Sequence, residues 1–570
     1  MRILKKSLIL ILLFSVMLNL AACGKTAEEE EEIYSTGGHD LVMGDAADNV
    51  FSMNRKNLTA NGKKYSMNPL VATNRSNQLI DDIVYENMLE VDSSFNVIPN
   101  IIKSWECNED GTTWTFELDT ENPHYFSDGE QVTGSDLRYS IERAVTGDRF
   151  LGRFTTFGGC SYTDTAIYVT LVSGNTQFVK LMNIPVIKNG TMEDEYPIGS
   201  GPYKFNEDGT KLIPNEYYRK DVELPLKEIY LVEYDTMEEI ISAYEDSYID
   251  IVMNDPSSYA NLGYSKSNEI RTFPTTNFHY VMFNQESNIC KYSSFRYAMN
   301  FAFDRENLAQ NLMGGNGDAT TVPMYPGCDI YPSSVASEIN YDMERVASIL
   351  DNAGIMDYDE DGKREYNNGA ALDFSVTILV CSESSAKVGC CQKFKEDMEK
   401  IGVSVIVKQA SWDDFITYLE RGEIGEFDEK GKWKKKSDWD MYYGEIKLRS
   451  DFDISPLFNV DSKWDEKYDI FRGLNYAKIS DTGFTEMIRA YMTASDYGRG
   501  EAFASMCNYL LTNGGMVSLA FERQQVITHR MAIRGVNPNE GNPMYDFVNW
   551  KIQFAEAEEP EPSAEPEKKK

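Results

Sequence analysis

Residues 385–407 read SAKVGCCQKFKEDMEKIGVSVIV, and they indicate the architecture of the chain more clearly than any other stretch. Five apolar residues recur at the spacing of one helix face: Val388, Cys391, Phe394, Met398 and Ile401. Gly402 follows them, and glycine is a residue type that often ends a helix. Residues 403–407 are rich in β-branched side chains, which are typical of a buried strand. A helix that leads directly into a buried strand predicts an α/β fold.

Strand and helix signals alternate in the same way elsewhere in the chain. Residues 112–118 alternate between apolar and polar side chains, which predicts a half-buried strand. We expect Ser135 to cap a helix whose apolar face is formed by Leu137, Ile141 and Ala144. Residues 294–312 predict one further helix, with an apolar face formed by Phe295, Met299, Ala302 and Phe303. These segments are too varied to form a repeat solenoid.

The length and charge of the chain limit its organisation and its partners. A chain of 570 residues with 42% hydrophobic residues exceeds the roughly 250–300 residues that one core supports, so two or more lobes are expected. A formal net charge of −36 disfavours nucleic acid and anionic lipid headgroups as partners. The nine cysteines include no CxxC pair, and apart from Cys23 we expect mostly buried free thiols.

The first 22 residues have the composition of an export signal. Basic residues precede an apolar run over residues 7–18, and Leu20-Ala21-Ala22 then leads into Cys23. As a helix, the apolar run is too short to cross a hydrocarbon core about 30 Å thick. Leu-Ala-Ala-Cys resembles the lipobox of bacterial lipoproteins, which implies cleavage before Cys23 and lipidation of its thiol. Two acyl chains at that position would hold the protein stably on a membrane.

Residues 80–141 contain several short motifs in a specific order and spacing: Val84 to Leu89, Ile98 to Asn100, Ser104 to Glu106, Glu109 to Leu118, Phe126 to Gly129 and Val132 to Leu137. Further motifs follow at Ile198 to Phe205 and Phe295 to Arg305. Together they are similar to extracellular solute-binding protein family 5, the oligopeptide- and dipeptide-binding lipoproteins of ABC importers. The resemblance extends over roughly residues 40–555.

This resemblance implies a periplasmic-binding-protein-like, type II (Venus-flytrap) α/β fold with two lobes and an extra subdomain in the first lobe. It divides the chain into a lipoprotein signal peptide (1–22), the lipidated Cys23 with an acidic linker (23–36), lobe I (37–78, 195–283 and 521–555), an inserted subdomain (79–194), lobe II (284–520) and a disordered tail (556–570). Hinge strands near Phe283-Asn284 and Leu519-Phe521 are expected to join the lobes.

The resemblance also implies a function without catalysis, metal or cofactor. A monomeric receptor at the extracytoplasmic face of the cell membrane would capture a short peptide by closing its lobes, since a ligand that contacts both lobes favours the closed state. It would deliver the peptide to an ABC permease that is driven by separate ATPase subunits. The acidic spacer after Cys23 favours a Gram-positive cell.

An aspartate in lobe II is the family's partner for the α-amino group of a peptide, because a buried cation needs a paired anion. Asp451-Phe452 matches the Asp-Tyr pair of relatives, so Asp451 is the first candidate, with Asp453 and Glu445 as alternatives. The tryptophan expected before this pair is missing and about two residues are inserted. The register therefore stays open, as does a plain loop role for Asp451.

Two weaker sets of ligand contacts follow from the same resemblance. Ala72, Thr73 and Asn74 lie where relatives run an extended segment along the ligand, and extended main chain can pair with a peptide as an added strand. Tyr442 and Tyr443 could line the pocket with their polar tips, and ordinary core packing is the alternative for both.

Other readings stay open or are disfavoured. The same receptor could carry an oligosaccharide, a nickel or haem complex, or a signalling peptide, and a cell-wall hydrolase, a foldase and an adhesin are more remote alternatives. Asp357, Asp359 and Asp361 open an EF-hand-like loop, but the twelfth position is Asn368, so we expect a turn between a helix and a strand. The four histidines show no metal-binding spacing.

Overall fold

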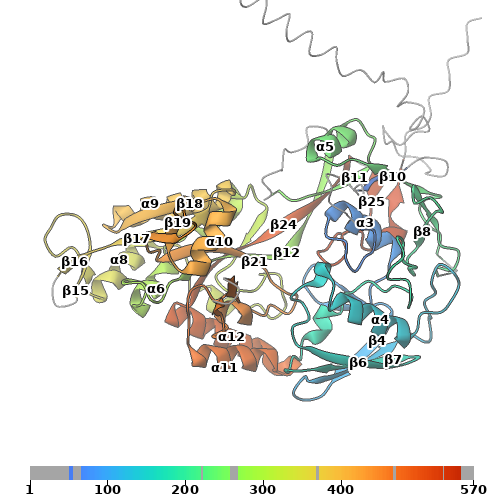
Figure 1. The fold of residues 1–570 in the computed structure, drawn as a ribbon, viewed down its shortest axis with the longest axis horizontal. Coiled ribbons are helices and arrows are strands. Elements are labelled where there is room, and N and C mark those ends of the chain that lie inside the picture. Colours follow the sequence, from blue (N-terminus) through green and yellow to red (C-terminus); the bar gives the residue numbers. More distant parts are fainter. Residues whose placement is uncertain are drawn as a thin grey trace, which may run out of the picture.

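The structure is a computed structural model that describes residues 51–55, 66–219, 222–256, 268–367, 371–465, 470–530 and 532–553. Cys23, the export signal, the acidic linker and the tail at 556–570 lie outside the described residues, so the expectations for them stay predictions. Two lobes with separate hydrophobic cores lie side by side and are joined by two long strands, β12 and β24 (Figure 1). The α/β architecture with two lobes is confirmed.

One large sheet extends through both lobes in the order β18-β17-β21-β12-β24-β11-β1-β10-β9-β8, and β13 also pairs with β24. Its strands are β1 (Ser52–Arg55), β8 (Tyr203–Phe205), β9 (Lys211–Pro214), β10 (Ile229–Glu233), β11 (Ile251–Asn254), β12 (Asn268–Phe283), β13 (Gly317–Ala319), β17 (Ser375–Cys381), β18 (Ser404–Ala410), β21 (Met441–Lys447) and β24 (Met516–His529). β12 pairs with β21 on the lobe II side, and β24 pairs with β11 on the lobe I side. Both long strands therefore belong to both lobes.

The pairing of β12 with β24 is irregular between Pro274 and Phe278. Proline has no N–H to give to a ladder, and within sheets it is confined to edges, strand starts and bulges. The Thr275 hydroxyl donates to the Glu522 carbonyl at 2.9 Å within this irregular segment. The segment precedes Phe283-Asn284, where the sequence placed a hinge, and the lobe boundaries stay predictions.

Lobe I contains the helices α3 (Arg75–Val84) and α5 (Met237–Glu245), and a small sheet of β25 (Ile533–Arg534) and β26 (Lys551–Ile552). The inserted subdomain consists of β2 (Leu89–Val91), β3 (Val97–Pro99), β4 (Ile102–Cys107), β5 (Thr113–Leu118), α4 (Gly134–Ala144), β6 (Phe157–Thr163) and β7 (Ala166–Leu171). Strands β4, β5, β7 and β6 form its four-stranded sheet. This sheet lies below the rest of lobe I in the view of Figure 1.

Lobe II places most of its helices around its part of the large sheet. The helices are α6 (Ser293–Met299), α7 (Ser333–Ala336), α8 (Met343–Asn352), α9 (Ser385–Lys400), α10 (Trp412–Arg421), α11 (Thr482–Met492) and α12 (Asp496–Asn513). A small three-stranded sheet is formed by β14 (Ile355–Met356), β15 (Glu365–Asn367) and β16 (Ala371–Asp373). Two strand pairs are formed by β19 (Ile424–Phe427) with β20 (Trp433–Ser437) and by β22 (Lys463–Asp465) with β23 (Ile470–Arg472).

The elements predicted from the sequence are mostly confirmed. The helix and strand at 385–407 are α9 and β18, and Gly402 between them has a φ of 85°. The strand predicted at 112–118 is β5, with alternate residues buried. The helix predicted after Ser135 is α4, but its N-cap is Thr133, because Thr133 and Asp136 form a capping box.

The single helix predicted over residues 294–312 is wrong. α6 ends at Met299, and a separate π-helical turn covers Asn307–Leu312. The carboxylate of Asp304 accepts a hydrogen bond from the Asn307 N–H at 3.0 Å, which caps a new helical start. Arg305 donates to the Asn300 carbonyl at 2.9 Å and so satisfies an acceptor that the end of α6 leaves free.

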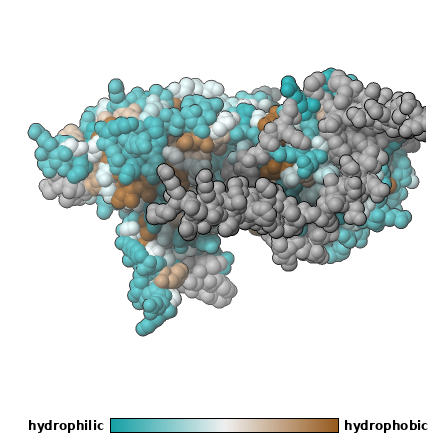
Figure 2. All heavy atoms as spheres, turned by 90° about the horizontal axis from the view of Figure 1, so that it is seen from above, coloured by the Kyte–Doolittle hydropathy of each residue, from teal (hydrophilic) through white to brown (hydrophobic). Residues whose placement is uncertain are grey.

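The hydrophilic surface and the mostly buried cysteines are those expected of an acidic protein with well-packed cores. Hydrophilic residues cover most of the described surface in the view of Figure 2, with a few small apolar patches. Six of the eight described cysteines are buried free thiols, as predicted, while Cys107 is exposed and Cys160 is half-buried. Within the described ranges, every helix is too short or too polar to cross a membrane.

Candidate functional site

A cavity of about 710 Å³, which we call the interlobe cavity, lies between the two lobes. Lobe I contributes Arg75 at the start of α3, and the inserted subdomain contributes much of the loop at 149–155. Lobe II contributes residues 446–450, at the end of β21 and in the loop after it. Pro274 and Thr276 of the irregular segment of β12 also face the cavity. Residues that are far apart in the sequence therefore share one space next to the strands that connect the lobes.

The lobes also touch at a second place, where the inserted subdomain meets α11 and α12 (Figure 1). The Asn175 side-chain amide donates to Asp451 Oδ2 at 2.9 Å, and the Thr176 N–H donates to the Met492 carbonyl at 2.9 Å. Arg499 donates to the Thr176 carbonyl at 3.2 Å. We call these contacts the interlobe latch. The latch therefore joins the inserted subdomain to lobe II in this structure.

The interlobe cavity is rich in positive charge, although the whole chain carries −36. Five lining residues are cationic: Arg75, Arg149, Arg153, Lys447 and Arg449. Three lining residues are acidic: Asp92, Asp453 and Glu540. Among the described residues that line it, none is a histidine or a cysteine. The wall therefore offers mainly guanidinium groups and carboxylates.

Arg449 is held between two aspartates. Its Nε donates to Asp451 Oδ1 and its Nη2 donates to Asp451 Oδ2, each at 3.1 Å, and Nη2 also pairs with Asp453. Burial alone would lower the pKa of Arg449, but the two carboxylates outweigh it and leave that pKa raised. Arg449 is therefore paired with two acids in this structure.

Two further cations of the cavity also have acidic partners. Lys447 Nζ lies 3.0 Å from Glu540 Oε1, and the Glu540 carboxylate also accepts the Thr276 N–H at 2.8 Å. Arg149 Nη1 lies 3.5 Å from Asp81 Oδ2, a carboxylate that burial gives a strongly raised pKa. Lys447 and Arg149 are thus paired, Arg149 less closely.

Arg75 and Arg153 contact only neutral oxygens. Arg75 donates to the side-chain carbonyls of Gln78 at 3.1 Å and Gln524 at 3.2 Å, and Arg153 donates to the Asn183 main-chain carbonyl at 2.9 Å. Burial lowers the pKa of Arg75, and burial together with the neighbouring arginines lowers the pKa of Arg153 to about 10. Both side chains are half-buried cations on the cavity wall.

Asp451, the first candidate for the amino group of a ligand, is fully buried and lies outside the cavity lining. Arg449 and Asn175 take up its carboxylate, so in this structure it joins the lobes. Phe452 is also fully buried, and its ring packs edge-to-face on Phe95 of the inserted subdomain at 5.3 Å. Asp453 does line the cavity. A ligand-binding role for each of the three stays a prediction.

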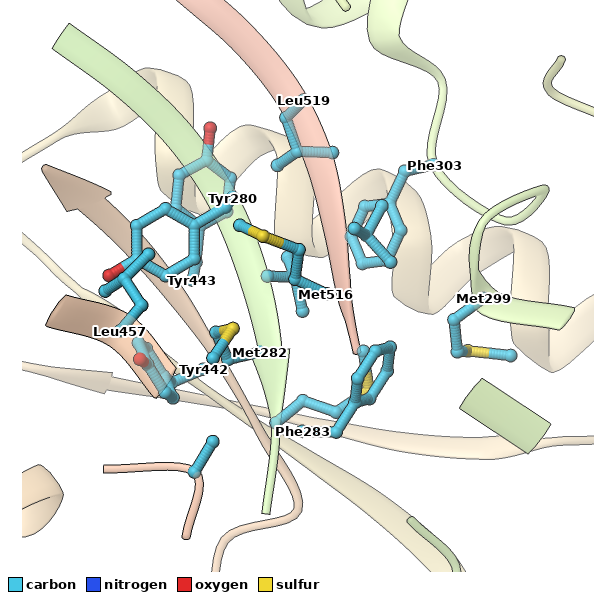
Figure 3. Packing of buried hydrophobic residues seen from close by; sticks show 14 of the residues in the cluster. Tyr280, Met282, Phe283, Met299, Phe303, Tyr442, Tyr443, Leu457, Met516 and Leu519 are labelled. Carbon is cyan, nitrogen blue, oxygen red and sulfur yellow. The ribbon is translucent and has the colours of Figure 1, made fainter. Parts of the chain in front are cut away.

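The remaining lobe II candidates lie on β21, away from the cavity lining. Glu445 forms an ion pair with Lys387 of α9. Tyr442 and Tyr443 are each 1% exposed, and Figure 3 places both among the buried hydrophobic residues of the core. Core packing, which was the alternative for the two tyrosines, is what the structure has, and the Tyr443 hydroxyl also contacts His279 Nδ1 at 2.9 Å.

The segment before α3 is only partly exposed to the cavity. Thr73 lines it, whereas Ala72 is fully buried. Asn74 is the N-cap of α3, and its side-chain oxygen accepts the Asn77 N–H at 2.9 Å. Capping explains why an asparagine stands there, and pairing of this segment with a peptide stays a prediction.

Sequence reasoning missed Arg149, Arg153 and Glu540. The two arginines stand four residues apart on either side of Phe150, whose ring centroid lies 5.4 Å from Arg149 and 4.8 Å from Arg153. Two cations at this spacing around an aromatic residue were a usable signal. Glu540 follows a proline and an asparagine in a loop, and nothing in its surroundings in the sequence sets it apart.

Two groups of potential metal ligands lie outside the interlobe cavity. His279, Glu445 and Glu522 bring ligand atoms within 4.8 Å of one another, and His279 Nε2 contacts Glu522 at 2.7 Å. A second group also brings its ligand atoms within 4.8 Å of one another, and it consists of Asp357, Asp359, Asp361 and Glu365. The turn that holds these three aspartates links β14 to β15, so it joins two strands, and the prediction of a turn between a helix and a strand is wrong.

A second cavity, of about 810 Å³, lies within lobe I and its inserted subdomain. Glu86 in its wall is paired with His124 at 2.8 Å and with Arg219 at 3.1 Å. Lobe II contributes nothing to its described lining. Closure of the lobes would therefore not enclose a ligand there, whereas the interlobe cavity is lined from both lobes and is the candidate site.

Known proteins resemble this chain in sequence and in fold. A sequence profile described as bacterial extracellular solute-binding proteins, family 5 middle, matches residues 96–459. An ABC transporter peptide-binding protein of Brucella ovis is 23% identical over 401 residues, which cover 64% of this chain and 70% of the relative.

Two solved structures show the same fold. The ABC transporter substrate-binding protein CtaP from Listeria monocytogenes has a TM-score of 0.66 at 16% identity, over 88% of this chain and 99% of that chain. A nickel ABC transporter from Bacillus halodurans has a TM-score of 0.65 at 17% identity, over 85% of this chain and 96% of that chain. The predicted type II periplasmic-binding-protein fold is confirmed.

Proposed function

Because the chain belongs to the bacterial extracellular solute-binding proteins of family 5, we propose that it is a lipid-anchored receptor that captures short peptides for an ABC importer. The lipid on Cys23 holds it at the extracytoplasmic face of the cell membrane. It acts as a monomer and hands its cargo to a permease that separate ATPase subunits drive.

The observation that carries this proposal is the interlobe cavity, whose wall comes from both lobes and from β12 between them. A ligand in such a cavity touches both lobes only when they are closed. It therefore shifts the equilibrium from open to closed by the difference between its affinities for the two states. The permease reads the closed form as the loaded form.

The charges of the wall match the two ends of a peptide. Asp453 and Glu540 are carboxylates that can receive an ammonium group, and the arginines can receive a carboxylate. Burial raises the pKa of Asp453, and its ion pair with Arg449 offsets this rise only in part, so a second cation in the cavity would further favour the ionised carboxylate. Among the carboxylates predicted from the sequence, Asp453 is the one we propose for the amino group.

A second cargo follows from the nickel transporter with the same fold. Imidazole and thiolate groups, which bind nickel well, are missing from the described cavity lining. A bare metal ion therefore finds poor ligands. A negatively charged metal complex, bound through the carboxylates of its chelator, suits the arginines and is our alternative to the peptide.

Native mass spectrometry of the full-length lipidated protein in detergent tests the proposal. The protein is measured as purified and again after unfolding, so that any bound cargo is released and weighed. A series of short peptides supports peptide capture. A single metal complex, sugar or haem mass keeps the receptor but replaces its cargo, and an empty protein that also fails to bind a peptide library refutes peptide capture.

A further inference from the structure

A group of metal-ligating side chains, which we call the three-strand cluster, spans the strands that join the lobes and the strand beside them. His279 lies on β12, Glu445 on β21 and Glu522 on β24. His279 and Glu445 stand directly opposite each other in the ladder of β12 and β21, so their side chains share one face of the sheet. Each of the three residues brings one ligand atom within 4.8 Å of the other two.

The imidazole of His279 has a partner at each ring nitrogen. Nδ1 lies 2.9 Å from the Tyr443 hydroxyl, and Nε2 lies 2.7 Å from Glu522 Oε1. A hydroxyl can donate and accept, so Tyr443 can accept the Nδ1 proton and leave the lone pair of Nε2 directed at the cluster. A histidine that ligates a metal ion is normally oriented by such a hydrogen bond at its second nitrogen. Tyr443 therefore fits the role of that partner.

The two carboxylates of the cluster are also oriented by neighbours. Glu522 Oε2 accepts the Asn277 side-chain amide at 3.0 Å, while Oε1 contacts His279. Glu445 pairs with Lys387 through Oε2, and a carboxylate has a second oxygen that can bind a metal ion. Like charges this close repel each other, and a divalent cation between the two carboxylates removes the repulsion.

Burial and access also suit a bound ion. His279 is 1% exposed and Glu522 is 2% exposed, so a cation beside them attracts their lone pairs more strongly than it would in water. The side chain of Glu445 is 32% exposed. An ion can therefore reach the cluster from solvent along Glu445, and an entry path is one requirement of a metal site.

We propose that His279, Glu445 and Glu522 bind a zinc ion that joins β12, β21 and β24. Zinc takes four tetrahedral ligands, nitrogen and oxygen among them, and three side chains with one water complete such a site. Ligands about 2.0–2.2 Å from a tetrahedral zinc ion lie roughly 3.4 Å from one another, so the contact between His279 and Glu522 has to widen by less than about 1 Å. Calcium and magnesium prefer oxygen ligands alone and suit the imidazole poorly.

The proposed zinc site lies beside the interlobe cavity, although none of its three ligands is among the described residues that line the cavity. Lys447, two residues beyond Glu445 on β21, lines the cavity, and so does Thr276 of β12. A zinc ion would fix the three strands relative to one another where β12 and β24 connect the lobes. The inference thus adds a structural ion to the receptor, and it does not depend on the identity of the cargo.

Zinc titration of the untagged full-length protein in detergent, stripped of metal with a chelator, tests the proposal. Calorimetry gives the affinity, and thermal unfolding shows whether zinc raises the melting temperature. Glu445→Gln should weaken zinc binding by at least about tenfold and remove the rise in melting temperature, and Tyr443→Phe should weaken binding by about tenfold. Glu426→Gln is the matched control, because Glu426 also lies on a strand and pairs with a lysine.

X-ray absorption at the zinc edge identifies the ligands of the bound ion. The three-strand cluster should give one imidazole nitrogen among oxygens. The group of Asp357, Asp359, Asp361 and Glu365 offers only oxygens, and Asp359→Asn disrupts it without changing the three-strand cluster. Zinc with an imidazole ligand that is lost in Glu445→Gln, and kept in Glu426→Gln and Asp359→Asn, supports the inference.

Three results would overturn the inference. The stripped protein could show neither a heat of binding nor a rise in melting temperature with zinc. The bound zinc could have oxygen or sulfur ligands without an imidazole. Zinc affinity could stay at the wild-type value in both Glu445→Gln and His279→Asn. Circular dichroism checks the fold of each variant, and if the buried change His279→Asn unfolds the protein, the partly exposed Glu445→Gln decides alone.

Discussion

Replacing Asp451 with alanine is expected to weaken lobe closure and the fold of lobe II, without removing a direct ligand contact. Two hydrogen bonds of 3.1 Å join its carboxylate to Arg449, and a third of 2.9 Å joins it to Asn175 across the lobes. Removing one partner of a buried ion pair typically costs about 3–5 kcal/mol. Asp453 still contacts Arg449 in the variant, so we expect the free energy of unfolding to fall by the lower end of this range, about 3 kcal/mol.

Thermal unfolding of the cargo-free protein measures this loss. At about 2–4 °C per kcal/mol for a unit of 150–250 residues, the melting temperature of lobe II should fall by roughly 6–12 °C. Titration with a short peptide and with its N-acetylated form measures the effect on binding. Because the variant weakens closure for every ligand, Asp451→Ala should lower both affinities by the same factor.

Asn175→Ala is the matched control for Asp451→Ala. It removes the contact across the lobes and leaves the pair with Arg449 intact, so it should lower both affinities with a smaller fall in melting temperature. The reasoning would be refuted if Asp451→Ala kept the wild-type melting temperature and lost only the peptide with a free amino group. That result would place the amine on Asp451, as the family resemblance implies.

Three further changes test the packing and the charges of the fold. Burial raises the pKa of Glu90 to about 8, so the folded state keeps a proton that the unfolded state releases above about pH 4.3. As the pH rises between these values, Glu90 should therefore lower the stability by up to about 1.4 kcal/mol per pH unit, and Glu90→Gln should remove this share of the slope in denaturant unfolding, while Asp82, whose pKa burial raises to about 7, keeps a slope of its own. Phe95→Ala removes the ring whose centroid lies 5.3 Å from that of Phe452, and it should lower the free energy of unfolding by about 3 kcal/mol, as thermal unfolding can measure. The same variant should bind cargo more weakly, as calorimetry can measure. A maleimide should label the exposed Cys107 quickly in the native protein and Cys160 slowly, because burial raises the pKa of Cys160 to about 12. Peptide mapping identifies the labelled thiols, and rapid labelling of the buried ones would contradict the packing.

The fold could be predicted because its signals are local. The apolar spacing from Val388 to Ile401, followed by Gly402 and a β-branched run, identifies a helix and a strand without knowledge of anything else in the chain. The break at Asn300 could not be predicted in the same way. It depends on Arg305, whose guanidinium group reaches the carbonyl of Ser518 at 2.7 Å, more than two hundred residues later in the chain.

The candidate site was harder to predict because its charges pair over long distances in the sequence. Asp451 looks like a free loop carboxylate in the sequence, and only the fold brings Asn175 to it. Lys447 and Glu540 are similarly remote from each other, and they meet beside the irregular segment of β12. Which cations stay unpaired is therefore a property of the assembled lobes.

Small-angle X-ray scattering tests the central claim most directly, namely that cargo binds between the lobes and closes them. The full-length protein in detergent is measured after its cargo is stripped and again after a saturating peptide, chosen by calorimetry, is added. We predict that the radius of gyration falls on binding, because a ligand that touches both lobes favours their closed arrangement. Identical curves for the stripped protein and for the calorimetrically saturated protein would contradict the claim.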